Sequence, residues 1–493
     1  MFAIRLVSDP DLSGTLVLPV ATGPDGTAAL PAVAGHVPAP VVEEARALLG
    51  TLDAASTPGA IHHLPRPLRT PSRVLLVGVG SGDEAGWRAA GAAVARVRPT
   101  EPRVTVALPA DVAPDAIRGV AEGLWLGSYR FRMAARQDGE RALEEVALAV
   151  DDVRRHEDAV ATARAVAGAT CFARDLTNTP SSLKSPAWFA DQVTAAAAAR
   201  PGLSVTVRDR AWLEAEGFGG ILAVGGGSAR EPCLLELRWC PDGGGDAVPH
   251  VVLVGKGITF DTGGISIKPR DAMKLMRKDM GGAAAIVAAT LGAADLRLPV
   301  RVTALAPLAE NMPSGSAFRP GDVVRHYGGM TSETTNSDAE GRLILADALA
   351  YAVDRLAPDV LVDLATLTGA NAIALGKRTA ALYSEDDSLA NALLAAAASA
   401  GEQAWRMPLV ADYVEYLRSD IADFYSAPDR GAGSVTAALF LREFTGPLRH
   451  RWVHIDMSAP SWSDQDDAEL SKGATGWGVR TLLRWLATLE PAR

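Results

Sequence analysis

Short runs of apolar residues without polar alternation recur through the second half of the chain, and alanine-rich helical stretches separate them. A strand that is apolar on both faces is buried on both, as in parallel or mixed sheets covered by helices. This pattern predicts an α/β fold with a mixed sheet covered by helices. The runs are His250–Val254, Val302–Leu308, Val360–Leu364 and Val453–Met457.

The length of 493 residues exceeds what one compact core usually holds, so we expect two domains. Residues 1–150 predict a smaller N-terminal α/β domain, in which the buried-type strand Val74–Val77 runs through Gly78–Gly82 into an alanine-rich helix. Those glycines lack the G-x-G-x-x-G spacing of a dinucleotide site, so a tight turn is expected. A helical pattern over residues 151–180, ended by Pro180, predicts a linking helix. Residues 181–493 then form a larger C-terminal domain.

The composition argues against several partners. The formal net charge is -10, and an acidic surface repels phosphate backbones, so we expect no nucleic-acid partner. The first residues lack a basic region followed by an apolar core, and the long apolar tracts are interrupted by charge or glycine. We therefore expect neither a secretory signal nor a membrane span. Cys171, Cys233 and Cys240 form no CxxC pair, which is typical of reduced thiols in a cytoplasmic protein.

Polar residues follow the apolar runs at the carboxyl ends of the expected strands, where open α/β sheets bind their ligands. The first run leads into a glycine-rich segment with one acid, and two further acidic segments stand directly before helical stretches. Acids before helices also cap them and complement their dipoles, which is the simpler explanation for Asp279 taken alone and an alternative for Asp338. Four acids share this placement: Asp261, Asp279, Asp338 and Glu340.

Taken together, the four acids favour a metal site over helix capping. Carboxylates that lie close together repel and stay ionised only when cations sit between them. Without His or Cys beside them, they suit divalent ions bound through oxygen, and two such ions about 3.5–4 Å apart activate water for hydrolysis. Arg342 opposes the dipole of the helix it opens, which indicates that an anion is held nearby. These residues predict a two-metal hydrolase without specifying its substrate.

Three segments resemble the leucyl aminopeptidase family, the two-metal cytosolic exopeptidases: Val254–Pro269 (VGKGITFDTGGISIKP), Met276–Ala284 (MRKDMGGAA) and Asn336–Leu343 (NSDAEGRL). Shorter matches extend the resemblance over about residues 170–485. It implies that the C-terminal domain is catalytic and releases the first residue of peptides. The tighter metal would be bound by the residues that match its ligands: Lys256, Asp261, Asp279 and Glu340. The more exchangeable metal would share Asp261 and Glu340 and add Asp338, with zinc or manganese expected at both.

The resemblance also implies how the reaction proceeds. A hydroxide activated by two metals attacks the scissile carbonyl, while Lys268 stabilises the gem-diolate oxygen. Bicarbonate held by Arg342 acts as general base. A mostly apolar pocket would favour Leu- or Met-like first residues. The residues that match its wall are Met276, Thr366, Leu367 and Gly369.

Assembly and biological role are further implications of the resemblance. Members of the family usually form a homohexamer, and we expect the same here. One departure stands before the acids of the third segment: the family has apolar residues and then Asn-Thr there, where this chain has Thr334-Thr335-Asn336-Ser337. That departure leaves open a peptidase dedicated to one biosynthetic precursor. Some relatives bind DNA as regulators, an alternative that the acidic charge of this chain disfavours.

Overall fold

The computed structural model describes residues 1–33, 37–97, 102–134, 143–243 and 248–490. The chain divides into two compact units, one of Met1–Gly168 with Asp464–Lys472 and one of Ala169–Ser463 with Gly473–Arg493. The division falls within helix α4 (Glu157–Asn178), which lies inside the stretch expected to link two domains. The boundaries at residues 150 and 180 stay predictions.

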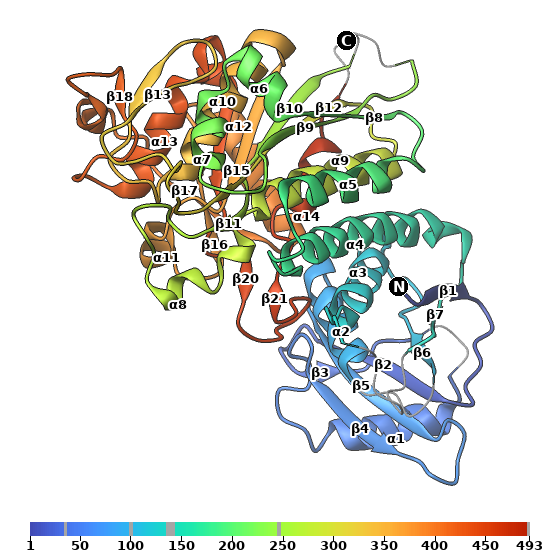
Figure 1. Cartoon of the computed structure of the whole chain (residues 1–493). Helices are drawn as coiled ribbons and strands as arrows, with labels where there is room; N and C mark the ends of the chain where they lie inside the picture. Colours follow the sequence, from blue (N-terminus) through green and yellow to red (C-terminus); the bar gives the residue numbers. More distant parts are fainter. Residues whose placement is uncertain (34–36, 98–101, 135–142, 244–247, 491–493) are drawn as a thin grey trace. The chain divides into compact units, whose positions relative to one another are not determined.

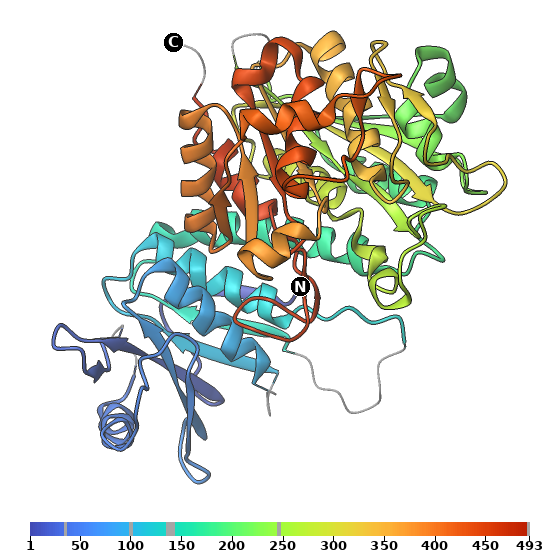
Figure 2. The same cartoon turned by 90° about the vertical axis from the view of Figure 1, so that its left-hand side faces the viewer.

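The described strands of the first unit form a sheet composed of β1 (Ala3–Val7), β2 (Thr15–Thr22), β3 (Ala28–Ala29), β4 (Ile61–Pro65), β5 (Arg73–Gly80), β6 (Arg103–Ala107) and β7 (Glu145–Ala149). Their spatial order is β1-β7-β6-β2-β5-β4, with β3 paired to β2. Neighbours are parallel except the pairs β4–β5 and β2–β3. Helix α1 (Ala39–Leu49) covers one face, and α2 (Glu84–Arg96) and α3 (Pro114–Ser128) cover the other (Figure 2).

The large sheet of the second unit contains β8 (Leu203–Arg208), β9 (Cys233–Trp239), β10 (His250–Gly255), β11 (Gly257–Asp261), β12 (Arg301–Asn311), β15 (Val360–Ala365), β16 (Thr379–Tyr383), β17 (Gln403–Arg406) and β19 (Trp452–Asp456). Its order is β17-β16-β19-β15-β10-β12-β9-β8, with β11 paired to β12. The central strands β19, β15, β10 and β12 are parallel to one another, whereas β16 and β9 run antiparallel to their central neighbours. The carboxyl ends of four strands therefore meet at one edge.

Helices cover both faces of this sheet (Figure 1). Successive residues of a strand point to opposite faces, and in β10 the side chains of Val252 and Val254 belong to the core that includes α7 (Gly219–Gly225) and α10 (Glu340–Tyr351). Gly255 faces α9 (Gly281–Asp295) so closely that an added Cβ would lie 2.7 Å from the backbone of Ala283. This two-sided burial explains why the strand sequences are apolar without alternation. The two units, each with a sheet covered by helices, confirm the predicted two-domain α/β fold.

The remaining elements of the second unit lie around this layer. Its other α-helices are α5 (Pro186–Ala197), α6 (Arg210–Glu216), α8 (Arg270–Met273), α11 (Ala370–Leu375), α12 (Asp387–Ala400), α13 (Gly433–Glu443) and α14 (Val479–Leu486). Its short strands are β13 (Val323–Arg325), β14 (Thr331–Glu333), β18 (Phe424–Tyr425), β20 (Trp462–Ser463) and β21 (Gly473–Ala474). Among the described residues, none of the helices has the length and apolarity needed to cross a bilayer.

Candidate active site

The predicted ligands gather at the carboxyl-end edge of the second unit's sheet. Lys256 follows β10 directly, and Asp261 is the last residue of β11. Asp279 stands between the 3-10 turn Met276–Lys278 (η3) and α9. Glu340 is the first residue of α10, and Asp338 stands two residues before it. Asp338 is half-buried, whereas the other four predicted ligands are at most 4% exposed.

Helix capping does not explain these acids. The N-cap of α9 is Met280 and that of α10 is Ala339, and in the described chain neither helix receives a side-chain hydrogen bond at its cap. The carboxylate of Asp279 instead accepts a hydrogen bond of 2.7 Å from the hydroxyl of Thr366. Side-chain capping is therefore ruled out for Asp279 and Asp338 in the described chain, and their carboxylates contact Lys256 and Lys268 instead.

The ammonium of Lys256 lies between two of the carboxylates. Its Nζ is 2.8 Å from Asp279 Oδ2 and 2.8 Å from Glu340 Oε1, and it donates to the carbonyl of Thr366 at 3.1 Å. Burial alone would lower the pKa of Lys256, but the charges of Asp279, Glu340 and Asp261 outweigh burial and raise it. A metal ion bound by this nitrogen must displace its proton, so metal binding here is coupled to proton release.

Lys268 neutralises the other half of the acidic cluster. Its Nζ lies 2.7 Å from Asp261 Oδ2 and also contacts Asp338 Oδ1. Burial opposes its charge, yet Asp261 above all raises the pKa of Lys268. The lysine is only 13% exposed at its side chain, so its charge acts on the carboxylates with little screening by solvent.

The acids remain difficult to ionise despite the two lysines. Burial, followed by the charge of Asp261, raises the pKa of Glu340 to about 8. The same two causes, in the same order, raise the pKa of Asp338 to about 6. Burial also raises the pKa of Asp279. Such shifts mark a place where added positive charge is strongly favourable.

The donor set fits a divalent metal. One oxygen from each of Asp261, Asp338 and Glu340 lies within 4.8 Å of the others. Glu340 Oε2 is buried and has no hydrogen-bond partner among the described residues. Oxygen ligands with a nearby amine suit hard or borderline divalent ions. The cluster is therefore able to hold a metal, and the full ligand assignment remains a proposal.

Glycines make room for the ligands. A Cβ on Gly341 would lie 2.5–2.8 Å from the end of the Lys256 side chain, so a larger residue at 341 would force that side chain to shift. Gly263 and Gly264 have φ angles of +86° and +61°, which side-chain-bearing residues rarely adopt. This left-handed turn directs the chain away from Asp261, whose carboxylate accepts a hydrogen bond of 2.8 Å from the nitrogen of Gly263.

Arg342 is arranged to bind an anion. The residue is 7% exposed, and one guanidinium nitrogen donates to the carbonyl of Ser426 at 2.7 Å. The buried Nε has no hydrogen-bond partner in the part of the chain that the structure describes. Burial lowers the pKa of Arg342 to about 10, with the acids Glu340 and Asp456 opposing. A buried guanidinium with a free donor favours a negatively charged ligand.

Comparison with known proteins decides the family. Residues 171–483 match the cytosol aminopeptidase family, catalytic domain, and residues 20–134 match the N-terminal domain of that family. A probable cytosol aminopeptidase of Micrococcus luteus is 44% identical over 96% of this chain and 95% of its own length. One of Nocardia farcinica is 43% identical over 90% of this chain and 89% of its own. The chain belongs to the cytosol aminopeptidase family.

This membership confirms the resemblance drawn from the sequence and makes the chain a hydrolase of the peptidase class. Solved structures are similar as well. The bottromycin maturation enzyme BotP in complex with Mn is 39% identical, with a TM-score of 0.83, and the match covers 97% of this chain and 99% of that one. The family domain of residues 171–483 contains every predicted site residue.

Two of the four residues expected to form the side-chain pocket, Met276 and Thr366, contact Asp279. Met276 opens η3, and its carbonyl accepts the hydrogen bond of the Asp279 nitrogen. Thr366, as described above, bonds the Asp279 carboxylate. The backbone nitrogens of Leu367 and Thr368 donate to the buried carboxylate of Asp456 at 3.1 and 2.9 Å. Gly369, which is exposed, ends this loop. Asp456 was missed from the sequence because its role is to hold backbone.

Asn311 is a second residue that the sequence analysis missed. It ends β12, and its Nδ2 donates to Asp261 Oδ1 at 2.8 Å and to the carbonyl of Ser337 at 3.0 Å. One amide thus orients a predicted ligand and also ties it to the segment that leads to Asp338. The residue lies in Leu308–Met312, one of the shorter stretches that resemble the family. No sequence pattern marks an asparagine at the end of a strand as the partner of a metal ligand, so its role could not be predicted.

The unusual segment Thr334–Ser337 is integrated into the site. The hydroxyl of Ser337 donates to the carbonyl of Gly263 at 2.7 Å and accepts from the nitrogen of Ser266 at 2.8 Å. Thr335 contacts the carbonyl of Ala427 through its hydroxyl. Ser337, at the place of the family's threonine, thus keeps local hydrogen bonds through its hydroxyl, whereas the buried hydroxyl of Thr334 has no hydrogen-bond partner among the described residues.

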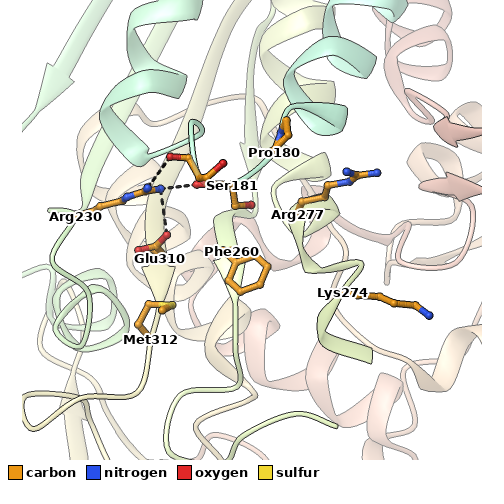
Figure 3. Close-up of a pocket in the computed structure, with 9 residues that line it drawn as sticks. Pro180, Ser181, Arg230, Phe260, Lys274, Arg277, Glu310 and Met312 are labelled. Carbon is orange, nitrogen blue, oxygen red and sulfur yellow. Dashed lines mark hydrogen bonds and ion pairs between the residues drawn. The ribbon is translucent and has the colours of Figure 1, made fainter. Parts of the chain in front are cut away.

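A pocket of about 350 Å³ lies on the other side of β11 from the acids, since Phe260 lines it and neighbours Asp261 in the strand. Figure 3 shows Arg230 reaching Ser181 and Glu310 across its wall. None of the predicted site residues lines this pocket, whose lining is Pro180, Ser181, Ser182, Arg230, Phe260, Lys274, Arg277, Glu310 and Met312.

Replacing Asn311 by Ala should weaken metal binding. The change removes the amide that orients Asp261, and partners of this kind typically contribute roughly 10- to 100-fold to metal affinity. Titration calorimetry with Mn²⁺ measures the effect, and Ser316→Ala, which removes an exposed hydroxyl five residues away, is the control. Wild-type Mn²⁺ affinity in Asn311→Ala would show that Asp261 needs no such support.

Proposed function

We propose that this chain is a metal-dependent aminopeptidase that releases Leu- or Met-like residues from the amino termini of peptides. The observation that carries the proposal is the buried cluster in which Lys256 and Lys268 lie among the predicted acidic ligands. Within a family of aminopeptidases, such a cluster is the part of the fold best suited to peptide hydrolysis. Peptides are thus the proposed substrates.

Two divalent metals are the cofactors we propose, held by the five residues that the resemblance assigns: Lys256, Asp261, Asp279, Asp338 and Glu340. Metals of this kind polarise a carbonyl and lower the pKa of water. Zinc and manganese are the expected ions, and the similar BotP structure, a complex with Mn, supports manganese. The shared oxygens of Asp261 and Glu340 would bridge the two sites.

The chain's own residues complete the proposed chemistry. The ammonium of Lys268 stands beside Asp261, where it stabilises negative charge that develops on the substrate oxygen. Arg342 holds an anion, for which we propose bicarbonate in the role of general base. Asp279 binds the free α-amine of the substrate, which restricts cleavage to amino termini. Met276 and the Thr366–Gly369 loop, held by Asp456, form the pocket for the first side chain.

A second candidate function is an aminopeptidase dedicated to one biosynthetic precursor. BotP, whose structure matches this chain with a TM-score of 0.83, is named a bottromycin maturation enzyme. The polar segment Thr334–Ser337 also differs from the apolar approach usual in the family. Both observations favour narrow specificity with the same hydrolytic machinery.

Glu340→Ala should abolish metal occupancy and peptidase activity together. Glu340 is the buried acid assigned to both metals, so its removal should cost more than the roughly 100-fold that outer partners contribute. Metal content by mass spectrometry and hydrolysis of Leu-amide measure the two effects. Glu231→Ala, at an exposed glutamate, serves as control. Activity with normal metal content in Glu340→Ala would refute the assignment.

A panel of aminoacyl amides and dipeptides separates the two candidate functions. We expect the Mn²⁺-loaded protein to cleave Leu and Met substrates fastest, because an apolar pocket discriminates by side-chain burial. Rates across the panel, compared at equal metal occupancy, give the specificity. A fully loaded protein that turns over no simple substrate would favour the dedicated peptidase.

Light scattering should report a homohexamer in solution. This expectation comes from the leucyl aminopeptidase resemblance. We also propose the cytoplasm as the compartment, because the relatives are named cytosol aminopeptidases. In the light-scattering experiment, a mass six times that of one chain is the expected result. The mass of a single chain at micromolar concentration would contradict it.

A further inference from the structure

Lys184 is a fully buried lysine whose ammonium lies in a cage of uncharged acceptors. It is 0% exposed, and its Nζ donates to the carbonyls of Leu176 at 3.1 Å and Thr177 at 3.0 Å. It also donates to the carbonyl of Arg277 at 2.6 Å and to the sulfur of Met280 at 3.2 Å. Four acceptors from two separate segments therefore converge on one nitrogen.

The chemistry of the cage favours a cation. Leu176 and Thr177 lie in the last turn of α4, where helix carbonyls lack intrahelical donors and the dipole is negative. Burial lowers the pKa of Lys184 well below its ordinary value, and the charge of Arg277 adds to this. Three carbonyl acceptors act in the opposite direction, because only the ammonium form offers three N–H donors.

Lysine is rare in this chain, and three of its lysines lie at or directly beside predicted ligands. Seven of the 48 basic residues are lysine, and none occurs before residue 184. Lys256 and Lys268 contact the predicted ligands, and Lys278 donates to the carbonyl of Ser458 at 2.8 Å. A compact ammonium suits a tight cage of carbonyls, whereas the planar guanidinium of arginine does not. The shape of the cage therefore favours lysine over arginine.

The cage encloses the segment that carries Asp279. Arg277 lies two residues before Asp279 and Met280 one residue after it, so Lys184 bonds a backbone carbonyl on one side of this acid and a side-chain sulfur on the other. The same turn after α4 reaches β11, where the hydroxyl of Ser181 donates to the carbonyl of Thr259 at 2.7 Å, two residues before Asp261. Figure 3 shows Ser181 beside Phe260, with Arg277 on the neighbouring segment.

We propose that Lys184 is a positioning residue for metal binding: its ammonium fixes the segment Arg277–Met280 against the turn Pro180–Lys184 and thereby sets the place of Asp279. This inference rests on the proposed function, in which Asp279 is a metal ligand. Met276, whose carbonyl bonds the Asp279 nitrogen, is positioned by the same contact. Lys184 itself touches neither metal nor substrate.

Titration calorimetry with Mn²⁺ on Lys184→Met and Lys184→Ala tests the proposal. Both variants should bind Mn²⁺ roughly 10- to 100-fold more weakly than wild type, as expected for loss of a residue that orients a ligand. Ammonium chloride should restore much of the affinity in Lys184→Ala, where the cage is open, and not in Lys184→Met, where a neutral side chain fills it. Tetramethylammonium chloride, too large for the cage, is the salt control.

Two further measurements separate positioning from simple stabilisation. Thermal unfolding of each variant gives its loss of stability, and Lys274→Ala, at an exposed lysine paired with Asp271, gives the baseline for losing a lysine in this region. Lowered melting temperature with wild-type Mn²⁺ affinity and kcat in both Lys184 variants would overturn the proposal. Rescue by ammonium is a response that a purely structural role does not predict.

Met280→Leu keeps the test decisive if the Lys184 variants do not fold. It removes one acceptor with little change in volume, and we expect Mn²⁺ affinity to fall about two- to fivefold; unchanged affinity would contradict the proposal.

Wild type and Asp279→Asn are measured in parallel. Wild type that binds no Mn²⁺ refutes the proposed function and this inference together, whereas normal wild type with unaffected Lys184 and Met280 variants refutes the inference alone.

Discussion

Mutual repulsion among four closely placed carboxylates, three of them buried, is the constraint on which the active region of the second unit depends. Asp261, Asp279, Asp338 and Glu340 converge because strands β10, β11, β12 and β15 end at one edge and two helices begin there. Low solvent exposure strengthens the repulsion and raises the pKa of three of these acids. Only closely placed positive charge makes the arrangement stable, and the two lysines supply part of it.

Hydrogen bonds from uncharged side chains and from the backbone help to hold the acids in place. Asn311 donates to Asp261, Thr366 donates to Asp279, and Asp456 accepts from the loop that contains Thr366. Lys184 lies one step further from the acids, since it bonds the carbonyl of Arg277 and the sulfur of Met280, on either side of Asp279, and not the Asp279 carboxylate. A site built this way keeps its geometry through contacts with rigid strands and helix ends, which favours tight placement of whatever cation binds there.

Sequence reasoning reached the fold and the acidic cluster because both depend on patterns of side chains. Unalternated apolar runs require burial on both faces, and Gly255, closely packed against Ala283, shows how tightly one of those faces is filled. Coordinates were needed to exclude side-chain capping by Asp279, because an acid before a helix looks the same in sequence whether or not it caps the helix. Lys184 escaped detection for a different reason: its partners are mostly main-chain carbonyls, which every residue possesses and no sequence pattern marks.

The first turn of α10 has a consequence for how enzymes of this design diversify. Glu340, Gly341 and Arg342 are consecutive, and they supply respectively a carboxylate, the clearance for Lys256 and a buried guanidinium. Any shift of that turn displaces all three at once, so gradual change cannot tune one without disturbing the others. Changes in substrate preference are therefore expected in the surrounding loops, such as Thr334–Ser337 and Thr366–Gly369. The turn itself has to be kept unchanged, in evolution and in protein engineering alike.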